Sequence, residues 1–258
     1  METTLIAAVS ASLGVIGKSL VDSFFKRRET NYEISKRYSR PILLAASELQ
    51  ARLLEITQRQ APSSKPLFLQ ENDSEAYSST YSMTRKHFLV STVYLFSKYF
   101  AYIEILKKKV QFLELRKINN SRNFSVLVKA VERTLAETEL RKKSKIQIRS
   151  DRQLFKLQQA YIGEKLIIEN DGEMLCMSFA EFYDKFDSVF SKLQDFEDLI
   201  EILTRAVSKE KEDFCLARCC LLGNALVDLV NFLDPSNQYV SKMDREKVTV
   251  LELEAYVQ

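Results

Sequence analysis

The chain of 258 residues has little glycine, proline or histidine. Its 5 Gly and 4 Pro leave few positions for the tight turns that a many-stranded β fold needs. The one histidine, His87, excludes sites built from two or more imidazoles, such as the paired-histidine zinc sites of metalloproteases. The sequence also lacks the glycine-rich phosphate-binding motifs and the G-x-S-x-G nucleophile elbow. We therefore expect a non-enzymatic protein with no catalytic residue, no cofactor and no metal ion.

Cysteine is also scarce, with residues at Cys176, Cys215, Cys219 and Cys220. A disulfide-stapled secreted domain is usually shorter and denser in cysteine, so we expect reduced thiols. Cys215 and Cys219 stand one helical turn apart and could share a metal or carry an acyl chain. Because neither a C-x-x-C motif nor a partner histidine accompanies them, we expect them to pack as small apolar residues.

The segment from Phe88 to Leu115 predicts the longest helix. Its apolar residues recur every three or four positions, without a Gly or Pro. A second apolar row widens the buried face, which predicts a central helix with other helices packed around it. We expect Ser97 and Glu104 on its polar side, with Glu104 paired to Lys108 one turn further on.

Other segments predict a bundle around this helix. Amphipathic helices are expected over residues 42–56, 124–139, 153–165, 178–207 and 211–233. Short apolar runs flank Asp171-Gly172, which indicates a β-hairpin. The predicted fold is all-α: a multi-helix bundle with a long central helix, an N-terminal anchor helix and one small hairpin. The expected organisation is an anchor with its basic flank over residues 1–28, a helical domain over 29–235 and a tail over 236–258.

The N-terminal segment is a candidate membrane anchor. Residues 5–17 carry no charge, Lys18 and Asp22 follow, and then come Lys26, Arg27 and Arg28. Apolar residues favour insertion by roughly 3–6 kcal/mol, while a Lys and an Asp at the helix centre cost roughly 5–7 kcal/mol. A span over residues 3–21 puts Lys18 near one end and Asp22 outside. The juxtamembrane basic cluster then predicts a single-pass topology with an outside N-terminus and a cytoplasmic domain. The alternative is a helix buried in the bundle.

A second basic run is a candidate binding patch. Its residues are Arg141, Lys142, Lys143, Lys145, Arg149 and Arg152. Such a run can bind phosphates of an anionic polymer or of lipid head groups. The nearby aromatic residues follow core spacing and not the pattern of a base-stacking platform, so nucleic acid is not favoured as a partner. A solvated connector is the simpler interpretation.

Four stretches together resemble a group of mostly helical, bacterial-type proteins that have an N-terminal hydrophobic segment before a cytoplasmic domain. The stretches are PILLAASELQARL from Pro41, YLFSKYFAYIEIL from Tyr94, IGE from Ile162, and LVDLVNFLDP from Leu226. The resemblance spans most of the chain from Pro41 to Pro235. It implies a membrane anchor but no activity. The fixed polar positions are Gln50, Arg52, Glu104, Glu164 and Asp234, of which Arg52, Glu104 and Glu164 are candidate buried polar residues. The charged Lys18 and Asp22 depart from the group's anchor.

The leading functional hypothesis is a membrane-tethered interaction or scaffold protein. Residues 3–21 would bind the membrane, and the helical domain would bind another protein or a second copy of the chain. One alternative is a soluble helical module that binds anionic polymer or lipid head groups through the run from Arg141 to Arg152. Another is an enzyme whose residues form no short motif, with Glu164, Arg52 or Glu104 in a deep pocket.

Overall fold

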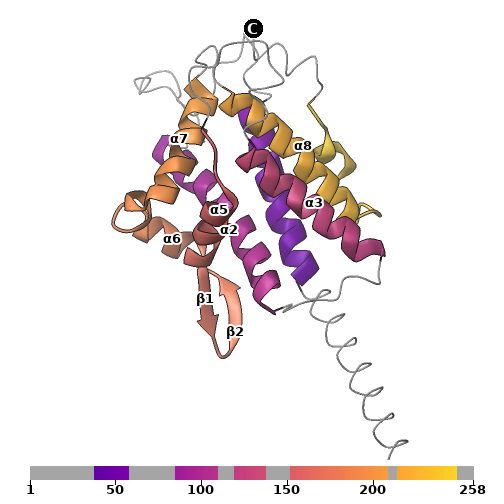
Figure 1. The fold of residues 1–258 in the computed structure, drawn as a ribbon, viewed down its shortest axis with the longest axis horizontal. Coiled ribbons are helices and arrows are strands. Elements are labelled where there is room, and N and C mark those ends of the chain that lie inside the picture. Colours follow the sequence, from indigo (N-terminus) through magenta and orange to yellow (C-terminus); the bar gives the residue numbers. More distant parts are fainter. Residues whose placement is uncertain (1–37, 58–84, 110–118, 138–151, 209–213, 249–258) are drawn as a thin grey trace, which may run out of the picture.

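The structure is a computed structural model that describes residues 38–57, 85–109, 119–137, 152–208 and 214–248. Within these ranges the chain forms a multi-helix bundle with one two-stranded hairpin (Figure 1). The predicted all-α class with a small hairpin is confirmed. The anchor predicted over residues 3–21 lies outside the described residues.

The helices follow one another in the order of the predicted segments. A helix over residues 38–57 comes first. It is followed by α2 (Arg85–Lys109), α3 (Asn119–Ala136), α5 (Lys156–Lys165), α6 (Phe179–Lys185), α7 (Gln194–Ser208) and α8 (Cys215–Leu233), with short 3₁₀ turns η2 (Phe190–Lys192) and η3 (Lys242–Arg245). Pro41 lies within this helix, where it has no N–H to donate to the carbonyl four residues earlier.

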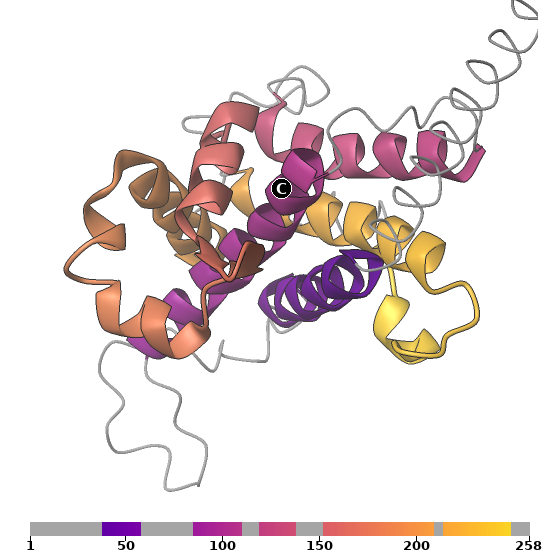
Figure 2. The same cartoon turned by 90° about the horizontal axis from the view of Figure 1, so that it is seen from below.

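Helix α2 is the centre of the bundle, as its wide apolar face predicted. It lies between α5, α6 and α7 on one side and the 38–57 helix with α3 and α8 on the other (Figure 2). Ser97 and Ala101, expected on a solvated stripe, are both 0% exposed, so that expectation was wrong. They are buried because α5 packs over this part of α2, and the Ser97 hydroxyl donates instead to the Val93 carbonyl at 2.8 Å.

The close approach of α5 to α2 depends on Gly163. A Cβ at this position would lie 2.7 Å from the carbonyl carbon of Phe100 and 2.9 Å from the amide nitrogen of Ala101. Such distances are shorter than van der Waals contact, so only glycine allows the two backbones to meet at this point.

The hairpin follows α5 directly. Strand β1 (Ile167–Asn170) pairs antiparallel with β2 (Glu173–Cys176), with Asn170 opposite Glu173. Asp171 and Gly172 form the turn, with φ of 50° and 74°. Positive φ at both central residues is the geometry that Asp-Gly favours in two-residue hairpins. The Lys109 side chain donates to the Gly172 carbonyl at 3.2 Å and ties the turn to the end of α2.

The helix predicted over residues 178–207 is interrupted, so that part of the prediction was wrong. It begins as expected, since Ser178 accepts a hydrogen bond from the Glu181 amide at 3.3 Å. In an unbroken helix Phe182 and Phe196 would lie roughly 21 Å apart along the axis. Their ring centroids are 6.3 Å apart, and Phe190 stacks on Phe182 at 4.6 Å. The break after α6 lets these rings gather in one buried cluster, which a straight helix does not allow.

We predict that Gly163→Ala lowers the free energy of unfolding by about 1–3 kcal/mol, the usual cost of overpacking. The matched control is Gly223→Ala in α8. Its Cβ would lie 3.9 Å from the Leu53 Cβ, so the helix propensity of alanine should leave stability unchanged or about 1 kcal/mol higher. Urea unfolding followed by circular dichroism gives both values. Equal stability of the two variants would contradict the close α2–α5 contact.

Candidate functional site

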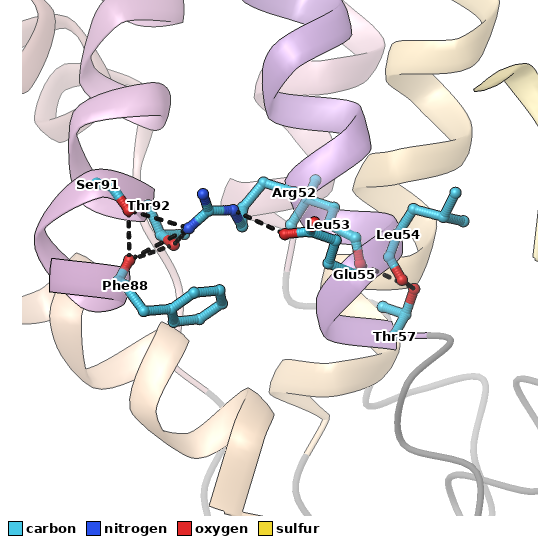
Figure 3. A network of polar contacts seen from close by, with 8 residues as sticks. All are labelled: Arg52, Leu53, Leu54, Glu55, Thr57, Phe88, Ser91 and Thr92. Atoms are coloured by element: carbon cyan, nitrogen blue, oxygen red, sulfur yellow. Dashed lines mark hydrogen bonds and ion pairs between the residues drawn. The ribbon is translucent and has the colours of Figure 1, made fainter. Parts of the chain in front are cut away.

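The densest polar cluster on the 38–57 helix is centred on Arg52 and joins this helix to α2 (Figure 3). Its Nη1 donates to the hydroxyls of Ser91 at 3.0 Å and Thr92 at 2.9 Å, and to the Phe88 carbonyl at 3.4 Å. Its Nε lies 3.2 Å from a carboxylate oxygen of Glu55, and the guanidinium carbon lies 4.6 Å from the centre of the Phe88 ring. One guanidinium therefore binds three polar groups that lie within about one turn of a neighbouring helix.

The chemistry of this cluster suits binding and not proton transfer. Burial lowers the pKa of Arg52 and Glu55 raises it, but an arginine remains a cation at neutral pH. The hydroxyls of Ser91 and Thr92 both donate to the Phe88 carbonyl, at 3.0 Å and 2.7 Å, while they accept from Arg52. Their protons are engaged in the helix itself. The arrangement can hold two helices together or attract an anion.

A second arginine, Arg218 in α8, is 0% exposed and caps the end of α3. Its Nη1 donates to the carbonyls of Thr134 at 2.6 Å and Leu135 at 3.2 Å, and both terminal nitrogens donate to the Glu137 carbonyl at 3.1 Å. The last carbonyls of a helix have no hydrogen-bond donor within it and carry partial negative charge. A guanidinium donates hydrogen bonds to these carbonyls and its positive charge also attracts them. The sequence analysis missed Arg218. The sequence feature that could have indicated it is a single cation in the otherwise uncharged run from Cys215 to Val227.

A third charged cluster lies after α8. Arg245 and Asp234 form an ion pair at 2.6 Å, with side chains 5% and 3% exposed. The Asp234 carboxylate also accepts from the amides of Gln238, Tyr239 and Val240 at 2.9–3.1 Å. Burial raises the pKa of Asp234, but these amides and the Arg245 charge outweigh it and hold the pKa below its usual value. Asp234 is therefore ionised at neutral pH, and it organises the turn that follows α8.

The two other candidate buried polar residues lie at different depths. The Glu104 side chain is 12% exposed and pairs with Lys107 at 2.8 Å, and Lys107 also pairs with Glu132 of α3. Lys108 instead pairs with Glu164, whose side chain is 48% exposed. The predicted Glu104–Lys108 pair was wrong, because the bundle supplies Glu132 and Glu164 from other helices as partners for the two lysines.

Most of the predicted basic residues lie outside the described ranges. Arg152 is described, and its Nε lies 3.0 Å from a carboxylate oxygen of Glu201 in α7. Glu201 also pairs with Arg205 at 2.7 Å. The undescribed members are Arg141, Lys142, Lys143, Lys145 and Arg149 of the candidate patch, and Lys26, Arg27 and Arg28 of the juxtamembrane cluster.

The cysteines lie in packed surroundings. Cys215, Cys219 and Cys220 are buried on α8, where they were expected to pack as small apolar residues. Burial raises the pKa of Cys176 to about 12, against a smaller lowering by Lys98 and Tyr94. A thiol with this pKa stays protonated near neutral pH and is a poor nucleophile or metal ligand. His87 packs against aromatic rings of α6, and the described residues contain no group of three or more His, Cys, Asp or Glu positioned to hold a metal ion.

Apolar side chains are exposed at the start of α5. Phe155 is 55% exposed and Leu157 is 83% exposed. Between them and α7, Gln158 donates to the Asp198 carboxylate at 2.7 Å. We name Phe155, Leu157 and Asp198 the α5–α7 surface. Its two apolar side chains are exposed at the start of α5, and α5 packs against the acidic helix α7.

Comparisons with known proteins give no match, so any inference about function rests on the fold and its sites. No protein-family model matches the chain, and neither the curated proteins nor the solved structures contain a significant match. The resemblance described above therefore stays a prediction. Two helices within the described ranges, Lys86–Lys109 and Cys215–Leu233, are long and apolar enough to cross a membrane. They are also the core helices α2 and α8, and buried core helices commonly pass the same criterion.

We predict that Arg52→Ala lowers the free energy of unfolding by about 2–3 kcal/mol, the value typical of hydrogen bonds to a part-buried charge. Arg52→Lys should recover little of this loss, because an ammonium lacks the planar fork that spans these partners. Lys98→Ala is the matched control. It removes the ion pair Lys98–Glu48, which joins the same two helices and whose side chains are 20% and 44% exposed. That change should cost about 0–1 kcal/mol in chemical denaturation. An equal loss for Arg52→Ala and Lys98→Ala would contradict the role given to Arg52.

Proposed function

We propose that this chain is a non-enzymatic, membrane-tethered interaction protein. Residues 3–21 form the tether, and the described helical bundle is the binding domain. Three buried or half-buried arginines support this role: Arg52 and Arg218 each bind backbone carbonyls of another helix, and Arg245 binds the Asp234 carbonyl at the end of α8. These contacts stabilise a rigid domain, which suits recognition of a partner.

The observation that carries the interaction half of the proposal is the α5–α7 surface. Leu157 and Phe155 are large apolar side chains exposed at the start of α5, and contact with a partner would remove them from water. Apolar anchors surrounded by charged residues are the usual composition of protein-binding surfaces. The surface therefore supports binding of another protein segment through apolar contacts at its centre.

The charge around this surface indicates the chemistry of the partner. Residues 179–208, which contain α6, η2 and α7, hold seven acidic and three basic residues, whereas the whole chain has a net charge of +3. Opposite charge on the partner speeds association and selects against acidic competitors. We infer a partner segment that is basic and carries apolar side chains. Arg152 already pairs with Glu201 within the chain, so the same acidic helix binds guanidinium groups in cis.

The tether is assigned to residues 3–21 and not to α2 or α8. Helix α8 carries Arg218, whose carbonyl partners lie on α3, and α2 carries the groups that bind Arg52. Moving either helix into lipid would strip a buried cation of these partners, which is costly in a medium without water.

We predict that the full-length chain pellets with membranes and stays there in high salt. Val9→Lys with Leu13→Lys should release it, because each cation near the centre of the span costs about 2.5–3.5 kcal/mol of insertion free energy. Val9→Ile with Leu13→Ile is the control and should remain in the pellet. Fractionation and immunoblotting measure both variants. Recovery of the double-lysine variant in the pellet would rule out residues 3–21 as the tether.

We predict that a photoreactive residue at position 157 cross-links in membranes to a segment rich in Lys and Arg, and that the yield falls in high salt. The control is the same residue at position 126 of α3, where Val126 is also apolar and 58% exposed. Mass spectrometry identifies the cross-linked segment. Equal yields at the two positions, or a partner segment without basic residues, would contradict the assignment of this surface.

A further inference from the structure

The last described residues return along α8. We name residues 241–248 the strap. Arg245 donates to the Asn231 side-chain oxygen at 3.1 Å and pairs with Asp234 at 2.6 Å. Lys247 pairs with Asp228 at 2.6 Å. Later strap residues therefore meet earlier residues of α8, so the strap runs antiparallel to the helix.

The last described contact of the strap joins the Asn224 side chain to the backbone of Val248. The Val248 amide donates to the Asn224 side-chain oxygen at 2.9 Å, and the Asn224 side-chain nitrogen donates to the Val248 carbonyl at 3.0 Å. Asn224 thus pairs with both backbone groups of one residue, as a neighbouring β-strand does. Pairing of this kind binds an extended chain whatever its side chain at that position.

The residues of α8 that hold the strap form one continuous row. Asn224, Asp228 and Asn231 are three or four residues apart, which places them on one face of the helix, and Asp234 follows three residues later, just after the end of α8. We name these four residues the polar ridge. They meet, in turn, the backbone of Val248, the ammonium of Lys247 and the guanidinium of Arg245. The ridge therefore binds a basic segment that contains the 3₁₀ turn η3, with an arginine at the end of the turn and a backbone contact three residues later.

Release of the strap separates the buried Asp234–Arg245 ion pair, and the arginine of another strap can restore it. When Arg245 departs, Asp234 keeps the amides of Gln238, Tyr239 and Val240 as partners. Arg245 Nε is buried and has no hydrogen-bond partner within the described part of the chain, so release returns this group to water. The strap residues with described side chains are exposed or half-buried, so little apolar surface opposes release.

We propose that the polar ridge is a binding site for a basic peptide segment, and that the strap of a second copy of this chain competes with the chain's own strap for it. Each copy carries both the ridge and the segment that fits it. Two copies with released straps can therefore satisfy each other reciprocally, as in a two-fold domain-swapped dimer. The chain's own strap occupies the site because its attachment gives it a high effective concentration.

The probe is a fluorescent peptide with the sequence of residues 241–248, amidated at its C-terminus. We expect it to bind full-length Arg245→Ala protein at least tenfold more tightly than the wild-type chain. This variant has an intact ridge but a weakened strap, so the peptide meets less competition in cis. Adding Asn224→Ala to the same protein should weaken peptide binding several-fold, and a peptide with Arg245→Ala should not bind. Fluorescence anisotropy measures all four combinations.

Two further variants keep the test decisive. Val248→Pro removes the N–H donated to Asn224 and restricts the backbone at positions 247 and 248, and it should raise peptide affinity even if Arg245→Ala loses its helical circular dichroism. Lys247→Ala is the matched control, because the Lys247 and Asp228 side chains are 46% and 47% exposed and their pair should matter little. Light scattering of a mixture of Asn224→Ala and Val248→Pro proteins should show more dimer than either protein alone, because the intact strap of the first pairs with the intact ridge of the second. Equal peptide binding by wild type and Val248→Pro, or binding that ignores Asn224→Ala, would overturn the proposal.

Discussion

The contact between Gly163 and the backbone of α2 positions one half of the bundle. It fixes how deeply α5 sits on α2, and the chain runs from α5 straight into β1 and β2. The hairpin turn consequently reaches Lys109 at the end of α2. The following segment lies where the Tyr94 hydroxyl donates to the Met177 carbonyl at 2.9 Å. The positions of the hairpin and α6 thus follow from a single missing side chain.

The other half is held by arginines that bind carbonyl oxygens. Arg52 joins the first described helix to α2, Arg218 closes the end of α3 from α8, and Arg245 fastens the returning chain to the Asp234 turn. In each case the guanidinium satisfies acceptors that helix geometry leaves available at a terminus or beside a hydroxyl. Such contacts are directional, unlike apolar packing. They specify which segments lie next to each other, and the exposed α5–α7 surface remains available for a partner.

Much of the architecture could be predicted from sequence because it depends on local periodicity and turn chemistry. The central helix followed from the spacing of apolar residues after Phe88, and the hairpin from Asp171-Gly172. The prediction of one helix over residues 178–207 was wrong because phenylalanines at helical spacing fit a straight helix and a broken one equally well. The partners of Lys107 and Lys108 could not be predicted, since Glu132 and Glu164 meet them only after the helices pack. Arg218 was missed for the same reason: its acceptors are backbone carbonyls, which no residue pattern marks.

The gathering of Phe182, Phe190 and Phe196 has a consequence for how this region comes apart. Helix α6 has seven residues and η2 has three, far fewer than an isolated helix needs to persist in water. Their hydrogen bonds survive only while the rings stay in contact. The stretch from α6 into α7 should therefore open as one cooperative unit, with its amides exchanging with solvent together and not helix by helix.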